Sequence, residues 1–248
     1  MLPDPNELTR KVAIVTGGGT GIGEAAARVL AAAGADVVVA ARKVERLAAV
    51  AESIRDSGRR CLAIPTDVRL EEDIQGLVEG TIAEFGRVDV VVNNAGGSYL
   101  FPMEETPIDR WDNSFALNVR GPFMLTQSAG RHMLAQGSGV FVNISSGAGL
   151  TGVAGGVAYS AAKAALQMLT RVVALEWGAK GIRANCIAVG AVASEGALRS
   201  WTRAGLIEQG ILERAGQPED IANGILYLAT DMSRFMNGET IALTGRPS

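Results

Sequence analysis

The chain has 248 residues, 48% of them hydrophobic and 20% charged, which supplies enough apolar material for a large core and differs from the composition of disordered chains. Its 23 basic and 26 acidic residues are interspersed and leave a formal net charge of −3. Nucleic-acid binding requires a basic patch, which this pattern does not indicate, so we expect no nucleic-acid partner. Single α/β domains often reach this length, and we expect one compact unit.

The N-terminal stretch MLPDPNELTRK has two prolines and four charged residues where a secretory signal needs an apolar run, so we expect a cytoplasmic protein. Residues 1–9 are predicted to form a loose extension of one domain over 10–248. The least charged stretch, Ser145–Ala162, is rich in Gly, Ser and Thr, which disfavours a membrane span. Two isolated cysteines and one histidine cannot supply the usual zinc ligands, so no metal is expected.

Short apolar runs alternate with helical patterns from the start of the chain. The first run, Lys11–Gly17, is rich in β-branched residues and ends in glycine, which predicts a buried strand. An alanine-rich helix follows and ends near Gly34. The next elements are predicted to be a strand at DVVVAAR, a helix at KVERLAAVAESIRDSG and a strand at CLAIPTD.

The same alternation continues to the C-terminus. The pattern predicts helices at about 71–85, 108–135, 159–177 and 218–230, separated by strands at VDVVVNNAG, GVFVNISS and IRANCIAV, with a last strand at TIALTG. An inserted segment at about 190–215 interrupts this rhythm. Because the strands are continuous apolar runs, we predict an α/β fold with a parallel sheet and helices on both faces.

The stretch TGGGTGIG (Thr16–Gly23) joins the first strand to the first helix. Glycines in such a turn let the backbone approach a pyrophosphate at the positive end of the helix. A strand precedes the turn, and a second strand begins about twenty residues later, as a dinucleotide site requires. A methyltransferase could also place glycines here, and it would bind no dinucleotide. The predicted cofactor contacts in the turn are Gly17, Gly19, Thr20, Gly21, Ile22 and Gly23.

The end of the second strand discriminates between nicotinamide cofactors. An acidic side chain there binds the free ribose hydroxyls and repels a 2′-phosphate. This chain instead has Ala41 followed by Arg42 and Lys43, two cations suited to binding a phosphate. We predict NADP(H), with NAD(H) as the alternative if Arg42 and Lys43 are ordinary solvated residues.

Several motifs in one order resemble the short-chain dehydrogenase/reductase family from Lys11 to about Gly245. The matching stretches are TGGGTGIG, Asp67–Val68, NNAG at Asn93–Gly96, Asn118, Ser146 and YSAAK at Tyr159–Lys163. Ser146 precedes Tyr159 by thirteen positions, which is the spacing usual in the family. The resemblance implies a single-domain, Rossmann-type, doubly wound parallel sheet with strand order 3-2-1-4-5-6-7.

The resemblance also implies roles for individual residues. Asp67 and Val68 are expected against the adenine. The other implied cofactor contacts are Asn94, Ala95, Gly96, Tyr159, Lys163, Gly190, Val192 and Ser194. The implied catalytic tetrad is Asn118, Ser146, Tyr159 and Lys163. In this tetrad Ser146 donates a hydrogen bond to the substrate oxygen, Lys163 binds the nicotinamide ribose, and Asn118 positions a water.

The tetrad suits proton transfer without a histidine, since the sole histidine, His132, lies elsewhere. Tyr159 and Lys163 are four residues apart and share one face of the predicted helix. A cation about 4 Å from a phenol is worth roughly 4 kcal/mol, or about three pK units. Lys163 is therefore predicted to bring the pKa of Tyr159 from about 10 toward neutrality. Taken alone, the pair would equally fit a buried tyrosine and a snorkelling lysine.

Two stretches depart from the family pattern. After the sixth strand, Val189 replaces the usual proline and Ser194 replaces a threonine, which predicts a looser loop that still binds the nicotinamide. The C-terminal LTGRPS lacks the usual Asp-Gly-Gly, which weakens any inference about subunit contacts. Homotetramers are common in the family, and we expect a homo-oligomer, tetramer or dimer.

Substrate choice is predicted to depend on the segment Ser194–Gly210 and the loop Gly96–Pro107. Their large side chains favour an apolar pocket for a fatty, alicyclic or aromatic carbonyl, although they would equally suit packing against a neighbouring subunit. These side chains are Tyr99, Leu100, Phe101, Met103, Leu198 and Trp201.

The predicted function is an NADP(H)-dependent oxidoreductase that acts on a carbonyl/alcohol pair, with a 3-oxoacyl thioester or an apolar ketone as substrate. The stretch SEGAL also resembles enoyl and dienoyl thioester reductases of the same family. A non-catalytic dinucleotide-binding regulator is the alternative from another class. Such a regulator would have no need to combine Ser146, Tyr159, Lys163 and Asn118.

Overall fold

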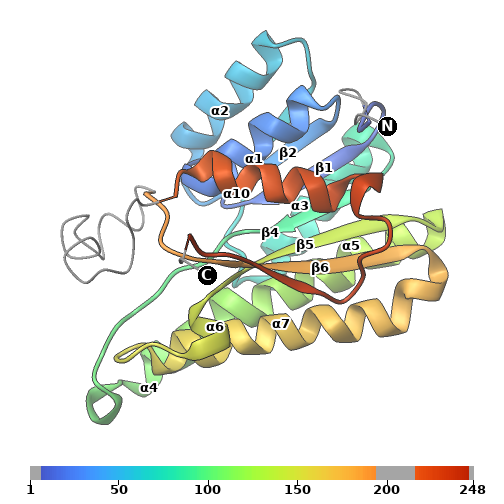
Figure 1. Cartoon of the computed structure of the whole chain (residues 1–248). Coiled ribbons are helices and arrows are strands. Elements are labelled where there is room, and N and C mark those ends of the chain that lie inside the picture. Colours follow the sequence, from blue (N-terminus) through green and yellow to red (C-terminus); the bar gives the residue numbers. More distant parts are fainter. Residues whose placement is uncertain (1–6, 194–215, 246–248) are drawn as a thin grey trace.

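The computed structural model describes residues 7–193 and 216–245, in which seven parallel strands form one sheet (Figure 1). The strand order is β3-β2-β1-β4-β5-β6-β7, so the predicted fold class and strand order are confirmed. The strands are β1 (Val12–Thr16), β2 (Asp36–Ala41), β3 (Cys61–Pro65), β4 (Val90–Asn93), β5 (Gly139–Ser146), β6 (Ile182–Val189) and β7 (Thr240–Leu243).

Helices cover both faces of the sheet. Figure 1 shows α1, α2 and α10 on one face and α5 and α7 on the other. The α-helices are α1 (Gly21–Ala32), α2 (Val44–Asp56), α3 (Glu71–Phe85), α4 (Ile108–Phe115), α5 (Gly121–Gln136), α6 (Ala148–Thr151), α7 (Val157–Trp177) and α10 (Pro218–Ala229). The shorter helical turns are η1 (Met103–Glu105), η2 (Ala116–Arg120), η3 (Gly178–Lys180) and η4 (Asp231–Ser233).

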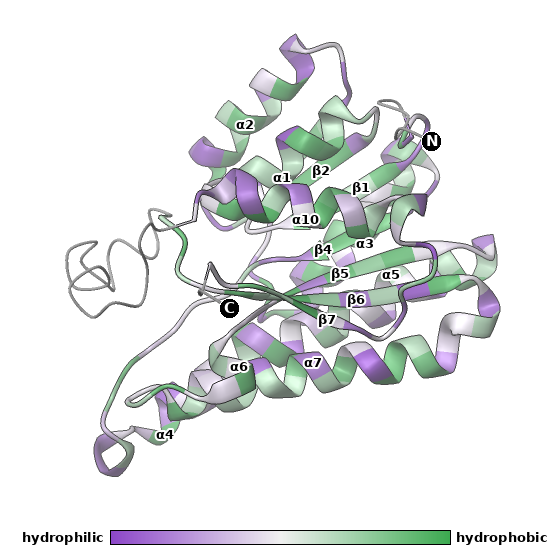
Figure 2. Ribbon diagram, in the orientation of Figure 1, coloured by the Kyte–Doolittle hydropathy of each residue, from purple (hydrophilic) through white to green (hydrophobic). Residues whose placement is uncertain are grey.

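Two hydrophobic cores flank the sheet because alternate residues of each strand face opposite sides. In β1, Ala13 and Val15 pack into the core beneath α1, α2 and α10, whereas Val12 and Ile14 pack into the core beneath α3, α5 and α7. All five residues of β1 are buried. Figure 2 shows the matching hydrophobic colouring of the central strands. Burial on both faces explains why the strands read as continuous apolar runs.

The helix predicted at about 108–135 is divided by a π turn. Helix α4 ends at Phe115, the wider turn η2 follows, and α5 begins at Gly121. Isolated π turns within helices are frequent at functional sites. The tetrad residue Asn118 lies in this turn and is fully buried.

The end of the predicted N-terminal extension packs against the sheet domain. Leu8 is buried, and its N–H donates to the carbonyl oxygen of Ala33. The chain is thus ordered against the core two residues before the boundary that the sequence predicted.

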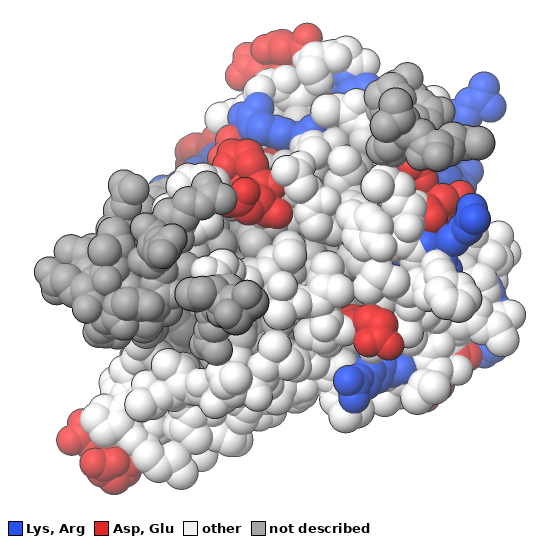
Figure 3. All heavy atoms as spheres, viewed as in Figure 1, with Lys and Arg blue, Asp and Glu red and all other residues white. Residues whose placement is uncertain are grey.

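The surface carries both signs of charge. On the face drawn in Figure 3, acidic and basic side chains are interspersed among broad uncharged areas. Within residues 7–193 and 216–245, no helix combines the length and the apolar character needed to cross a membrane.

Candidate active site

A groove of about 800 Å³ runs across the C-terminal ends of the parallel strands. Most of the predicted site residues line it, and they are Gly17, Thr20, Gly21, Ile22, Arg42, Asp67, Val68, Asn94, Ala95, Gly96, Ser146, Tyr159, Lys163, Gly190 and Val192. Gly19, Gly23, Lys43 and Asn118 do not line it. Ser194 lies outside the described residues.

Close packing explains the glycines at the β1–α1 turn. Gly17 has a φ of +66°, and a Cβ there would lie 2.8 Å from Nδ2 of Asn94. A Cβ on Gly23 would overlap the carbonyl oxygen of Gly17. Helix α1 begins at Gly21, and the side chain of its N-cap residue, Thr20, makes no capping hydrogen bond. The first N–H groups of α1 therefore face the groove as donors for an anion, which fits a dinucleotide pyrophosphate.

Thr16, to which the sequence assigned no role, ties the ends of β1 and β4 together. Its hydroxyl donates to the carbonyl oxygen of Val92 at 3.2 Å and accepts from the N–H groups of Asn94 and Ala95. In return, Nδ2 of Asn94 donates to the carbonyl oxygen of Thr16 at 2.9 Å. The NNAG motif thus fixes the position of the glycine turn. A hydroxyl residue at the strand end before the glycines is the sequence signal for this role.

Lys163 is buried beneath the other end of the groove. Its Nζ donates to the carbonyl oxygen of Ile144 at 2.8 Å and lies 5.8 Å from the ring centroid of Tyr159. Burial lowers the pKa of Lys163 to about 8. The backbone of Gly96 passes so close that an added Cβ would lie 3.2 Å from this Nζ.

The pKa of Tyr159 differs from its prediction. Burial raises the pKa of the phenol above its usual value of about 10, and a hydrogen bond with Ser146 opposes the shift without reversing it. The predicted shift toward neutrality is therefore wrong for this structure, because desolvation of the phenolate outweighs the hydrogen bond with Ser146. Ser146 itself is anchored at the end of β5, where its Oγ accepts from the N–H of Ala148 at 3.2 Å.

Asn118 holds the loop after β4 through its side-chain amide. Its Nδ2 donates to the carbonyl oxygens of Ser114 and Gly97, and its Oδ1 accepts from the N–H of Gly97 at 3.3 Å. The amide therefore holds the loop after β4 against the π turn. Asn118 is also close to Lys163, because a Cβ on Gly96 would lie 2.9 Å from Oδ1 of Asn118 and 3.2 Å from Nζ of Lys163.

Two residues that the sequence did not single out join α7 to the end of β5. Oγ of Ser145 donates to the carbonyl oxygen of Lys163 at 3.0 Å, and Nε2 of Gln167 donates to Oγ of Ser145 at 3.0 Å. This chain of hydrogen bonds fixes the end of β5 relative to α7. Only the structure could reveal it, because the residues are far apart in sequence.

Charged residues at the nucleotide end of the groove have different environments. Hydrogen bonds from Arg69, which the sequence did not single out, hold the pKa of Asp67 below its usual value. Arg42 also lines the groove, and it is exposed and forms no ion pair with any described residue. Lys43 is exposed and does not line the groove.

The loop after β6 completes the groove. The N–H of Gly190 donates to the carbonyl oxygen of Leu243 at 3.0 Å, and a Cβ on Gly190 would lie 2.5 Å from the carbonyl oxygen of Thr244. Glycine is therefore required here by the close approach of β7. Val192 forms a parallel bridge with Gly216.

The predicted substrate segments are only partly described. Tyr99 and Leu100 line the groove, together with Val153 from the segment before α7. Phe101 and Met103 do not line it, and Met103 is 70% exposed. Leu198, Trp201 and most of the inserted segment lie outside the described residues.

Comparison with known proteins identifies the family. The family model for short chain dehydrogenases matches residues 11–203. The chain is 38% identical over 241 residues to cis-4-hydroxycyclohexanecarboxylate dehydrogenase of Sinomonas cyclohexanicum, with 96% of both chains covered. It is 35% identical over 247 residues to peroxisomal 2,4-dienoyl-CoA reductase of Danio rerio, covering 97% of this chain and 82% of that one.

A solved structure agrees with these relatives. The crystal structure of levodione reductase matches with a TM-score of 0.91 at 31% identity and covers 96% of this chain and 97% of that one. The chain belongs to the short-chain dehydrogenase/reductase family. It is therefore an oxidoreductase that uses a nicotinamide dinucleotide, and the methyltransferase alternative is excluded.

Proposed function

We propose that the protein is an NADP(H)-dependent oxidoreductase in which Tyr159 exchanges the proton with the substrate oxygen. The observation that carries this proposal is that Ser146, Tyr159 and Lys163 line one end of the groove that starts at the N-terminus of α1. A dinucleotide bound by the helix would lie along this groove toward the three side chains. When bound, the nicotinamide supplies or accepts the hydride.

The side chains divide the remaining chemistry among them. Ser146 donates a hydrogen bond to the substrate oxygen, where negative charge develops during reduction. The raised pKa keeps the phenol of Tyr159 protonated at neutral pH, so it is ready to donate its proton to that oxygen. After the transfer, Lys163 passes a proton to the Tyr159 phenolate and regains one from solvent; burial lowers the pKa of Lys163 to about 8, which eases the loss of its proton. Asn118 holds Gly97 and thereby the wall opposite the catalytic helix.

The preference for NADP(H) is supported by Arg42. Its guanidinium lies in the groove lining at the end of β2, without an ion pair to a described carboxylate. Asp67, the acidic side chain of this part of the lining, is paired with Arg69. A 2′-phosphate can therefore bind Arg42 by charge-assisted hydrogen bonds without facing an unpaired carboxylate.

An apolar ketone, or the corresponding secondary alcohol, is the proposed substrate. Leu100 and Val153 line the groove beside Tyr159, and they favour an uncharged, apolar substrate body. The relative cis-4-hydroxycyclohexanecarboxylate dehydrogenase supports a substrate that contains a ring. The dienoyl thioester reductase relative supports the second candidate, reduction of a 2,4-dienoyl thioester.

The test is NADPH oxidation by the purified protein, followed at 340 nm with a substituted cyclohexanone, a 3-oxoacyl thioester and a 2,4-dienoyl thioester. The proposal expects turnover of the cyclohexanone and a lower KM for NADPH than for NADH. A lower KM for NADH would overturn the cofactor assignment. Turnover of the dienoyl thioester alone would favour the second candidate, and binding of NADPH without turnover of any carbonyl would favour a regulator.

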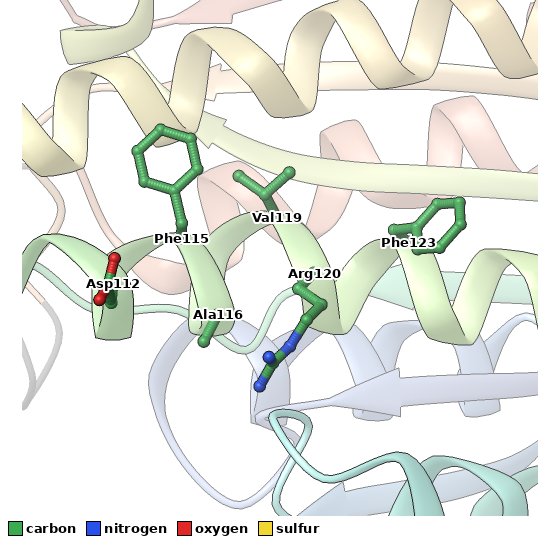
Figure 4. Close-up of a pocket in the computed structure, with 6 residues that line it drawn as sticks. All are labelled: Asp112, Phe115, Ala116, Val119, Arg120 and Phe123. Carbon is green, nitrogen blue, oxygen red and sulfur yellow. The ribbon is translucent and has the colours of Figure 1, made fainter.

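We also propose a homo-oligomer. Figure 4 shows Phe115, Val119 and Phe123 on one side of the segment formed by the end of α4, η2 and the start of α5, and Arg120 on the other. Further apolar side chains are exposed on α7, among them Met168 (56%) and Leu175 (83%). Exposed apolar surface of this extent favours contact with a second copy. Light scattering after size-exclusion chromatography tests this proposal, and a mass of one chain at micromolar concentration would overturn it.

A further inference from the structure

A continuous chain of side chains links the two ends of the groove. It runs from Asp67 through Arg69 and Asn113 to Tyr99. Asp67 and Arg69 lie between β3 and α3, Asn113 lies on α4, and Tyr99 lies in the loop after β4. Asp67, Arg69 and Tyr99 all line the groove. Three separate segments are therefore joined by side-chain contacts alone.

Arg69 is the centre of this chain, which we call the Arg69 tether (Asp67, Arg69, Asn113 and Tyr99). Its Nε donates to Oδ1 of Asp67 at 2.9 Å, and its Nη2 donates to Oδ2 of the same carboxylate. Its Nη1 donates to Oδ1 of Asn113 at 2.8 Å. The carbonyl oxygen of Arg69 accepts from Arg120 at 3.0 Å, which fixes the backbone as well. A guanidinium bound in this planar, bidentate way has little freedom to turn.

The second half of the tether fixes Tyr99. Nδ2 of Asn113 donates to the hydroxyl oxygen of Tyr99 at 3.1 Å. The guanidinium of Arg110 lies over the Tyr99 ring, 5.1 Å from its centroid. Tyr99 is 36% exposed, so burial alone does not set the direction of its ring. Asn118 holds the backbone of the loop at Gly97, two residues earlier, so the polar contacts of the Tyr99 side chain set the direction of its ring.

We propose that Arg69 is a positioning residue that sets substrate affinity by holding Tyr99, through Asn113, at the substrate end of the groove. This inference rests on the proposed function, since it assigns the substrate to the end that holds Tyr99 and Tyr159. The same contacts join Asp67, at the nucleotide end, to the substrate loop. Cofactor binding at Asp67 and substrate binding at Tyr99 are therefore coupled.

The test breaks the tether at Asn113, which lies outside the groove lining. Asn113→Leu removes both hydrogen bonds, and Asn113→Asp restores them, because a carboxylate accepts from Arg69 and from the Tyr99 hydroxyl. Tyr99→Phe removes the last hydrogen bond without disturbing the ring. Asp112→Asn, at the exposed neighbouring position on α4, is the matched control.

The expected result is a rise in the KM of the carbonyl substrate of about three- to tenfold for Asn113→Leu and for Tyr99→Phe, the factor carried by one hydrogen bond. The kcat is expected to stay within about twofold, as it does when binding common to substrate and transition state is lost. Asn113→Asp is expected to recover the wild-type KM. The double variant Asn113→Leu/Tyr99→Phe should have a KM no higher than that of Asn113→Leu alone. Backbone amide hydrogen exchange of the loop 97–102 should be faster in Asn113→Leu than in the wild type. Addition of NADPH should slow this exchange less in Asn113→Leu than in the wild type.

Two results would overturn the tether. One is a KM in Asn113→Leu equal to that of Asp112→Asn, with unchanged exchange of the loop. The other is a loss in kcat and melting temperature that Asn113→Asp does not rescue, which would indicate a merely structural residue. Failure of the proposed function looks different: the wild type itself would oxidise no NADPH with any carbonyl, while the exchange measurement would still report on the tether.

Discussion

The substitution Gly96→Ala tests the packing between Lys163 and the π turn. An added Cβ would lie 2.9 Å from Oδ1 of Asn118 and 3.2 Å from Nζ of Lys163. The first distance is too short for a carbon–oxygen contact, so the Asn118 amide has to move. That amide is buried and hydrogen-bonded to Gly97 on both of its polar atoms.

The magnitude follows from the bonds that must change. Weakening a buried hydrogen bond costs about 1–3 kcal/mol, which lowers the melting temperature of a domain of this size by about 2–12 °C. Displacement of Lys163 adds an effect on rate, because misplacement by up to about 1 Å can cost a hundredfold. We expect kcat to fall by about tenfold to a hundredfold.

Gly97→Ala is the matched control, since its added Cβ would lie 3.5 Å from Cδ2 of Leu117, an ordinary van der Waals contact. The assay is NADPH oxidation at 340 nm together with thermal unfolding of both variants. The reasoning is refuted if Gly96→Ala keeps the wild-type kcat and melting temperature, or if Gly97→Ala loses as much as Gly96→Ala.

Three further predictions concern charges. Burial alone would raise the pKa of Asp89, but hydrogen bonds from Arg87 and the Val12 N–H outweigh it and lower the pKa. Because this stabilisation is present above the unfolded pKa of about 3.9 and is lost as pH falls through the folded pKa, Asp89→Asn should lower the melting temperature more at pH 7 than at pH 3; an equal difference at both pH values would contradict this. The pKa of Lys163 is about 8 when folded and about 10.4 when unfolded, so the folded state binds fewer protons between these values and stability rises with pH there. The melting temperature of the wild type relative to that of Lys163→Met should therefore rise from pH 7 to pH 9.5. A difference in melting temperature that stays constant over this range would contradict the lowered pKa. Arg42→Ala should raise the KM for NADPH at least tenfold with little change for NADH, whereas Lys43→Ala, outside the groove, should change neither by more than about twofold; equal effects of the two variants would refute the assignment of the phosphate to Arg42.

The fold could be predicted from the sequence because local pattern and global topology agree. Continuous apolar runs such as Val12–Thr16 are strands buried on both faces. Gly86 caps the C-terminus of α3, and Gly34 follows the end of α1. Strand order came from the resemblance, since periodicity alone does not order the strands of a sheet. The π turn at η2 was not predicted, because Asn118 is held there by Gly97, twenty-one residues earlier in the chain.

The candidate site could be predicted only in part. The glycine turn and the tetrad follow from motifs. Ser146, Tyr159 and Lys163 line the groove together with most of the turn, whereas Asn118 lies outside its lining. Gly19 was predicted from the glycine motif and Lys43 from its charge after the second strand, and neither lines the groove. The pKa of Tyr159 was predicted from one distance to Lys163, whereas desolvation, which depends on the whole surroundings, determines its direction. Arg69 was missed because its partners, Asn113 and Tyr99, belong to other segments.

The proton-transfer role of Tyr159 is tested most directly by Tyr159→Phe, which keeps the ring and removes only the hydroxyl. NADPH binding, measured by quenching of protein fluorescence, should stay within about twofold of the wild type. The rate of carbonyl reduction under saturating NADPH should fall by about a hundredfold or more, as expected for loss of a general acid. Reduction at a rate within threefold of the wild type would show that another group delivers the proton.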